Sequence, residues 1–253
     1  MTLKEPYFLD LPTPTGLMRT HLFCPSKGMW PSVILYSEIY QMTGPIQRLA
    51  MRLAGEGFEV LVPEVYHEYE ELGTVLAYDK GGTDRGNFLK FEKPIASYDS
   101  DAQALLDHLT GRADYPWDQI GTLGFCLGGH LAFRAALDPR VAAATCWYPT
   151  DIHSATLGLG QIDDTLIRSG EIEAELLLIW GRQDPHVSGE GRRLIYEELT
   201  EKKRNFQWHE FNAAHAFARD EGIRYDAAVT RIGWQMTLEI FKRRLLTLTH
   251  KPI

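Results

Sequence analysis

The sequence predicts an α/β fold with a mostly parallel central sheet, helices on both of its faces and an N-terminal antiparallel hairpin. Short apolar runs, at 32–36, 141–147 and 175–181, are typical of buried parallel strands. Helix-length segments with apolar residues on one side, such as 43–55 and 97–110, alternate with these runs. Residues 5–24 contain two strand-like stretches around a turn rich in proline and threonine, which indicates the hairpin.

The remaining elements follow the same alternation. Strands are expected at 58–63, 121–125 and 206–211, and helices at 127–136, 189–203 and 225–246. Residues 64–96 show no strong period but many tyrosines, acids and glycines, so they are interpreted as a lid or substrate-binding insert. A second irregular connection is expected at 154–172. With neither an internal repeat nor a linker, the chain is interpreted as a single domain over 1–253.

Composition narrows the classes of function. The formal net charge is −8 and no basic run stands out, which argues against a nucleic-acid partner. No apolar segment reaches membrane length, and residues 1–6 lack the apolar core of a signal peptide. The three scattered cysteines fit neither a disulfide framework nor a zinc motif, so a cytoplasmic protein is expected. The sequence makes no prediction of oligomeric state.

The segment 121–136 carries the strongest chemical signal. It reads as a strand, then Gly124-Phe125-Cys126-Leu127-Gly128-Gly129, then a helix. Small residues around one central side chain permit a very sharp turn that lifts this side chain above the sheet, as in the nucleophile elbow of α/β-hydrolases. Here Cys126 takes the central place, and the dipole of the following helix favours a thiolate.

Other capable residues follow predicted strands, at the edge where ligands of open α/β sheets bind. Asp184 and His215 come after Cys126 in the order nucleophile, acid, histidine that α/β-hydrolases use. His215 is expected to take and return a proton, and Asp184 to orient its ring. The backbone N–H groups of Leu127 and Ile39 are the expected donors to an oxyanion.

Simpler interpretations apply to the other cysteines and to the histidines, and two alternative functions are considered. Cys24 and Cys146 are taken as inert buried thiols. A metal site at His186, His209 and His215 matches no ligand spacing, so no metal is predicted. A redox role for Cys126 has no partner cysteine nearby. A non-catalytic small-molecule binder on the same fold stays open.

Four pieces of the chain resemble the dienelactone hydrolases, also called carboxymethylenebutenolidases. The pieces are 37–40, the elbow at 124–129, Trp180 to His186, and the run His215-Ala216-Phe217-Ala218-Arg219. The resemblance implies a cofactor-free α/β-hydrolase that opens a lactone or ester through a thioester on Cys126. It also implies that Glu38 contacts the resting thiol and that Arg219 pairs with a substrate carboxylate.

Two further features complete the hypothesis. The family's second carboxylate-binding arginine falls within 64–96, where Arg85 and Lys80 are candidates, and Ala216 stands where the family usually has serine. Tyr148 follows a predicted strand and is a candidate for the pocket wall. The predicted function is a cysteine-dependent hydrolase of small, anionic lactones or esters; the alternative is an esterase or thioesterase for another substrate class.

Overall fold

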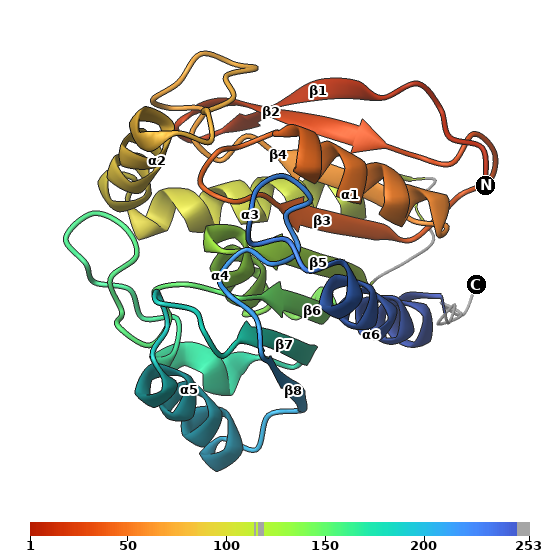
Figure 1. The fold of residues 1–253 in the computed structure, drawn as a ribbon. Coiled ribbons are helices and arrows are strands. Elements are labelled where there is room, and N and C mark those ends of the chain that lie inside the picture. Colours follow the sequence, from red (N-terminus) through yellow and green to blue (C-terminus); the bar gives the residue numbers. More distant parts are fainter. Residues whose placement is uncertain (114, 116–118, 247–253) are drawn as a thin grey trace.

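Eight strands form one continuous sheet in the computed structural model, which describes residues 1–113, 115 and 119–246 (Figure 1). Their order across the sheet is β1-β2-β4-β3-β5-β6-β7-β8. β1 and β2 form the predicted hairpin, and β3 to β8 run parallel to one another, which confirms the predicted fold class. The strands are Tyr7–Thr13, Gly16–Phe23, Ser32–Tyr36, Glu59–Pro63, Ile120–Phe125, Val141–Trp147, Glu175–Gly181 and Phe206–Phe211.

Helices cover both faces of this sheet. α1 and α6 pack on one face, whereas α3, α4 and α5 contribute to the core on the other. The helices are α1 Gly44–Gly55, α2 Lys80–Glu92, α3 Ile95–Thr110, α4 Leu127–Ala135, α5 Gly189–Glu201 and α6 Ala227–Leu245, with a short 3₁₀ helix at Ile167–Glu171. Among the residues that the structure describes, none of these helices combines the length and apolar character needed to cross a lipid bilayer.

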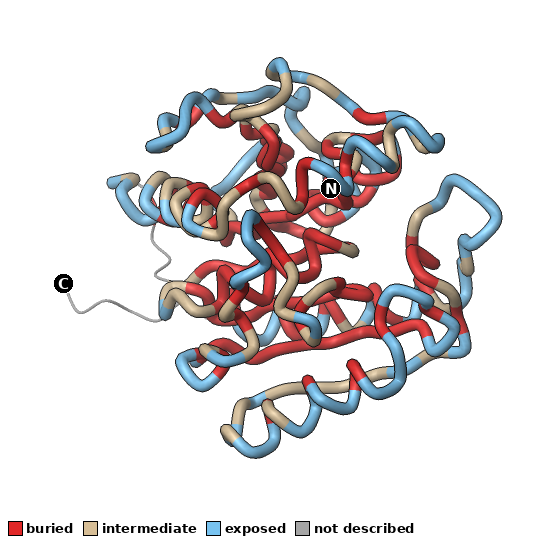
Figure 2. The backbone as a smooth tube through the Cα atoms, turned by 90° about the vertical axis from the view of Figure 1, so that its left-hand side faces the viewer, coloured by how far each residue is buried: buried red, intermediate tan, exposed pale blue. Residues whose placement is uncertain are grey.

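The strands divide their side chains between two cores. In β7, Leu176, Leu178 and Trp180 point into one core, and Leu177 and Ile179 point into the other. All five are fully buried, and each contributes about 1.5–3 kcal/mol through removal of apolar surface from water. An uninterrupted apolar run is therefore needed because both faces are covered. Figure 2 shows the buried residues concentrated along the middle of the molecule and the exposed ones along its periphery.

The segment 64–96 is more regular than the sequence suggests, because it contains the helix α2. The glycines at 81, 82 and 86 lower its intrinsic helix propensity, which hides the helix from a periodicity argument. Two tertiary features offset this. The Asp79 side chain accepts a hydrogen bond from the Gly82 N–H at 2.8 Å and caps the helix. A Cβ at Gly86 would lie 2.6 Å from the carbonyl oxygen of Ile39, so glycine lets α2 pack onto the loop after β3.

Candidate active site

Cys126 lies on the sharp turn between β5 and α4, with a φ of 58° and a ψ of −118°. Close approach between backbones explains the glycines around it. A Cβ at Gly124 would lie 1.8 Å from the carbonyl oxygen of Gly128, and a Cβ at Gly128 would lie 2.2 Å from that of Tyr36. The turn therefore brings the N-terminus of α4 against the end of β3. The strained conformation of Cys126 is held by this packing.

Asp184 and His215 come from the loops after β7 and β8. A Cβ at Gly181 would lie 2.4 Å from the carbonyl oxygen of Ala213, so glycine lets the two loops approach. The His215 Nδ1–H donates to Asp184 Oδ2 at 2.6 Å, and the backbone N–H of His186 donates to Asp184 Oδ1 at 2.8 Å. Both carboxylate oxygens are thus occupied, which fixes the orientation of the imidazole.

The other side of the His215 ring faces Cys126. Burial by itself would lower the pKa of His215, but the charge of the Cys126 thiolate and hydrogen bonds to Asp184 and Cys126 raise this pKa to about 10. The protonated imidazolium is therefore the favoured form of His215 at neutral pH. The structure therefore brings Cys126, His215 and Asp184 together from three separate loops.

Two backbone donors near the elbow are unused. Within the described part of the chain, neither the Ile39 N–H nor the Leu127 N–H donates a hydrogen bond. Leu127 is the first residue of α4, where the helix dipole adds partial positive charge. Ile39 follows β3, whose end touches Gly128 of the same helix. Both donors are therefore available to an anionic oxygen.

Tyr148 and His186 pack against the ring of His215. The Tyr148 ring meets it edge-on with centroids 5.1 Å apart, and the His186 ring does so at 4.5 Å. Tyr148 is fully buried and holds an unusual positive φ of 39°. Burial, and secondarily the charge of Glu38, raises the pKa of Tyr148 well above its ordinary value, so the ring stays a neutral phenol. Tyr148 thus forms a rigid wall beside the imidazole.

Glu38 and Arg219 lie in contact with each other. Arg219 NH1 is 3.6 Å from Glu38 Oε2, and the Tyr78 hydroxyl donates to the same oxygen at 3.5 Å. Burial raises the pKa of Glu38, and the charge of Arg219 opposes this shift. Among the described residues, the side-chain polar contacts of Glu38 are with Tyr78 and Arg219, and its contact with the resting Cys126 thiol stays a prediction.

The Arg219 guanidinium is held by aromatic rings. Its central carbon lies 4.3 Å from the centroid of Tyr78 and 5.8 Å from that of Tyr40. Its buried Nε has no hydrogen-bond partner within the described residues. Tyr78 belongs to the segment 64–96 and was not singled out in the sequence, where the only signal was the high tyrosine content of this segment. The Thr43 Oγ1 and the Tyr78 hydroxyl, 2.7 Å apart, fix the ring further.

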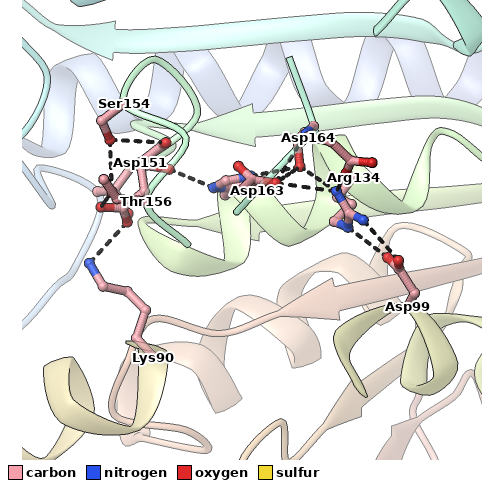
Figure 3. A network of polar contacts seen from close by, with 11 residues as sticks. Lys90, Asp99, Arg134, Asp151, Ser154, Thr156, Asp163 and Asp164 are labelled. Atoms are coloured by element: carbon pink, nitrogen blue, oxygen red, sulfur yellow. Dashed lines mark hydrogen bonds and ion pairs between the residues drawn. The ribbon is translucent and has the colours of Figure 1, made fainter. Parts of the chain in front are cut away.

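The other two basic candidates point elsewhere. Arg85 donates to Glu70 at 2.6 Å and lies partly exposed on α2. Lys80 is paired with Asp84 on the same helix and is almost fully exposed. Within the described residues, no hydrogen bond or ion pair joins either of these side chains to Arg219. Lys90 is the cation of α2 that reaches the opposite loop, where it donates to Asp151 at 2.9 Å (Figure 3).

A second polar network anchors the far end of α4. Arg134 donates through two nitrogens to Asp99, at 2.6 and 2.8 Å, and through the third to Asp164 at 2.7 Å and Asp163 at 3.2 Å (Figure 3). His130, on the same helix, hydrogen-bonds the carbonyl oxygen of Thr150 at 2.8 Å. These contacts tie α4 to α3 and to the loop after β6.

Asp184, His186 and His215 also form a group whose ligand atoms all lie within 4.8 Å of one another. His209 is not part of this group, so the three-histidine set considered from the sequence is not assembled. The Asp184 and His215 atoms bond each other, and the second carboxylate oxygen holds the His186 N–H. Two of the three members of this group, Asp184 and His215, are thus engaged in a hydrogen bond with each other.

Comparison with known proteins identifies the family. The model of the dienelactone hydrolase family matches residues 18–245. The chain belongs to the dienelactone hydrolase family. A Saccharomyces cerevisiae protein described as "Putative carboxymethylenebutenolidase" is 45% identical over 251 residues, covering 94% of this chain and 91% of that protein. The carboxymethylenebutenolidase of Pseudomonas sp. strain P51 is 26% identical, covering 90% and 91%.

The fold is shared with solved structures. A dienelactone hydrolase-like promiscuous phosphotriesterase from metagenomic libraries superposes with a TM-score of 0.75 at 20% identity, covering 97% of this chain and all of that one. This likeness supports the assignment of an α/β-hydrolase fold to the present chain. The segment 64–96 and its helix α2 lie within the part that the family model matches.

Proposed function

We propose that the chain hydrolyses small, anionic lactones or esters with Cys126 as nucleophile, His215 as proton carrier and Asp184 as the residue that orients it. The observation that carries the proposal is the placement of His215 between Asp184, at 2.6 Å, and the thiol of Cys126 on its strained turn. A histidine held by a carboxylate beside a nucleophile is the arrangement that acyl transfer requires.

In the proposed reaction, the Cys126 thiolate adds to the carbonyl carbon, and the resulting oxyanion is bound by the N–H groups of Ile39 and Leu127. The carbonyl–oxygen bond of the lactone or ester then breaks. The leaving oxygen takes the proton of the His215 imidazolium, which leaves a thioester and a neutral imidazole. The imidazole next removes a proton from a water molecule that attacks the thioester, and the acid departs with the thiolate restored.

The proposal that the substrate is anionic rests on Arg219. This cation lies beside Glu38 in the candidate site and keeps one N–H without a partner among the described residues. A planar guanidinium suits a carboxylate, which it binds through two parallel hydrogen bonds. A substrate carboxylate would therefore share Arg219 with Glu38, whereas the Tyr78 ring keeps the guanidinium in place.

The nucleophile is tested by Cys126→Ala with 4-nitrophenyl acetate as substrate. We expect kcat/KM to fall at least about 10³-fold, because the attacking group is gone. Cys146→Ala is the matched control, since this thiol is fully buried in β6, and it should retain activity within about threefold. Intact-mass analysis of acid-quenched wild type should show an acetyl group on Cys126. Full activity in Cys126→Ala would contradict the proposal that Cys126 is the nucleophile. A wild-type protein that hydrolyses no ester or lactone would favour the alternative, a non-catalytic small-molecule binder on the same fold.

The substrate class is tested by Arg219→Gln with a pair of substrates that share one leaving group, 4-nitrophenyl acetate and mono-4-nitrophenyl succinate. We expect KM for the succinate to rise about 10- to 100-fold, as for loss of a charged hydrogen bond, and KM for the acetate to change little. Arg85→Gln is the control and should affect neither substrate, because its partner is Glu70. Equal effects of Arg219→Gln on both substrates would assign a structural role to Arg219.

A further inference from the structure

The helix α2 packs against the loop that carries Ile39, one of the two proposed oxyanion donors. A Cβ at Gly86 would lie 3.0 Å from the Cβ of Ile39 as well as 2.6 Å from its carbonyl oxygen. One turn earlier in α2, Thr83 Oγ1 and the Tyr40 hydroxyl form a hydrogen bond at 2.8 Å. Because α2 contacts two successive residues of this loop, the position of the Ile39 N–H depends on where the helix lies.

The C-terminal part of α2 is tied to the loop after β6 by an ion pair. Lys90 Nζ donates to Asp151 Oδ2 at 2.9 Å, and Figure 3 shows the Lys90 side chain extending from α2 to Asp151. The two side chains are 10% and 14% exposed, so solvent screens the pair only weakly. Burial would raise the pKa of Asp151, but the charge of Lys90 and hydrogen bonds from Thr150 and Lys90 lower this pKa, so the carboxylate is ionised at neutral pH.

Asp151 is attached in turn to the segment that carries the nucleophile. The backbone N–H of Thr150 donates to the carbonyl oxygen of Cys126 at 3.3 Å, and Thr150 Oγ1 donates to Asp151 Oδ2 at 2.6 Å. Asp151 itself has a φ of 67°, a left-handed conformation that is uncommon for residues other than glycine. Its carboxylate is therefore held in a fixed place relative to Cys126 and to the Leu127 N–H that follows it.

We propose that the ion pair between Lys90 and Asp151 sets the separation of the two oxyanion donors, which makes both of its members positioning residues for acyl transfer. This role rests on the proposed function. One donor, the Leu127 N–H, follows Cys126 on the segment to which Asp151 is tied, whereas the other, the Ile39 N–H, lies against the helix that carries Lys90. When the pair is broken, α2 can shift relative to the nucleophile, and the oxyanion that forms on the substrate carbonyl loses part of its stabilisation.

The first test removes one charge of the pair at a time, with 4-nitrophenyl acetate as substrate. Lys90→Met and Asp151→Asn should each lower kcat/KM about tenfold or more, towards the cost of about 10²- to 10³-fold for loss of a whole oxyanion donor. Asparagine tolerates the left-handed conformation, so Asp151→Asn changes the charge without straining the backbone. The double variant should be no slower than the slower single variant, because one interaction is lost in all three.

Asp84→Asn is the matched control, because it makes the same substitution in an ion pair of the same helix. Asp84 pairs with Lys80, and both side chains are mostly exposed. Solvent-exposed pairs contribute little, so this variant should retain the kcat/KM of the wild type. Circular dichroism would confirm that Lys90→Met, Asp151→Asn and Asp84→Asn are folded.

Alkylation of Cys126 by iodoacetamide separates positioning of the donors from a general structural effect. In this reaction the thiolate displaces iodide from a saturated carbon, so the thiolate is required but no oxyanion forms. The second-order rate constant, followed by intact-mass analysis, should therefore stay within about twofold of wild type in Lys90→Met and Asp151→Asn, although ester hydrolysis falls.

Several results would overturn the proposal. An unchanged kcat/KM in both variants, or an equal fall in Asp84→Asn, would show that the pair does not position the donors. An equal fall in hydrolysis and alkylation would assign a general structural role to the pair, and a rise in both would make the pair a barrier to substrate entry. A wild-type protein that hydrolyses no ester would refute the proposed function and this role with it, a result distinct from an active wild type with unaffected variants.

Discussion

The two ends of α4 carry polar groups in opposite states. At its N-terminus, Cys126 lies on a strained turn, and the adjacent Leu127 N–H has no hydrogen-bond partner among the described residues. At its last turn, Arg134 is 5% exposed and donates from all three of its nitrogens to carboxylates of Asp99, Asp163 and Asp164. Reactive groups must keep an unsatisfied side for substrate, whereas structural charges are stable only when they are paired.

Substitution of Cys126, His215 or Asp184 should therefore change the rate of hydrolysis far more than the free energy of unfolding. Asp184→Asn keeps the shape of the side chain but removes the charge that holds the His215 tautomer. We expect kcat for 4-nitrophenyl acetate to fall about 10³- to 10⁴-fold. The urea midpoint should shift only slightly, which denaturation followed by circular dichroism would measure. If Asp184→Asn lowered the urea midpoint strongly but left kcat unchanged, the residues near the N-terminus of α4 would contribute to stability and not to rate.

Substitution in the Arg134 network should have the opposite result. Arg134→Met fills similar volume but leaves the buried Asp163 with fewer partners. We expect the free energy of unfolding to fall by about 3 kcal/mol, measured by urea denaturation. The kcat of the folded fraction should stay within about threefold of wild type.

Arg168→Met is the control for Arg134→Met. Arg168 pairs with Glu171 at the surface, where ion pairs contribute about 0–1 kcal/mol. If both variants cost the same free energy, burial of the Arg134 pairs would not be the cause of their contribution.

The titration of His215 sharpens the comparison further. The pKa of His215 is raised to about 10, so its proton stabilises the folded state fully below the reference value of about 6.5 and this contribution is lost as the pH rises through about 10. Cys126→Ala removes the main cause that raises this pKa and leaves the burial that lowers it. NMR of the imidazole Cε1–H should therefore show a midpoint at least about one pH unit lower in the variant. An unchanged midpoint would mean that thiolate and imidazolium do not interact.

Much of the fold could be predicted from local sequence. The strands at 32–36, 141–147 and 175–181 and the hairpin were predicted where they lie, because fully buried strands need continuous apolar runs. The helix α2 was missed, because its three glycines resemble a loop and only contact with Ile39 explains Gly86. The candidate residues Cys126, Asp184 and His215 could be selected because each follows a strand of one parallel sheet, although their catalytic roles stay predictions.

The sequence by itself determined the order of elements, the sharp turn at Cys126 and the edge of the sheet at which capable side chains gather. These features depend on residues that are near one another in the chain, such as the glycines at 124, 128 and 129. Only the tertiary structure decided which charges meet. Glu38, from the loop after β3, pairs with Arg219, from the loop after β8, against the ring of Tyr78, and Lys90 of α2 pairs with Asp151 in the loop after β6. Such contacts depend on distances in space that no local pattern records.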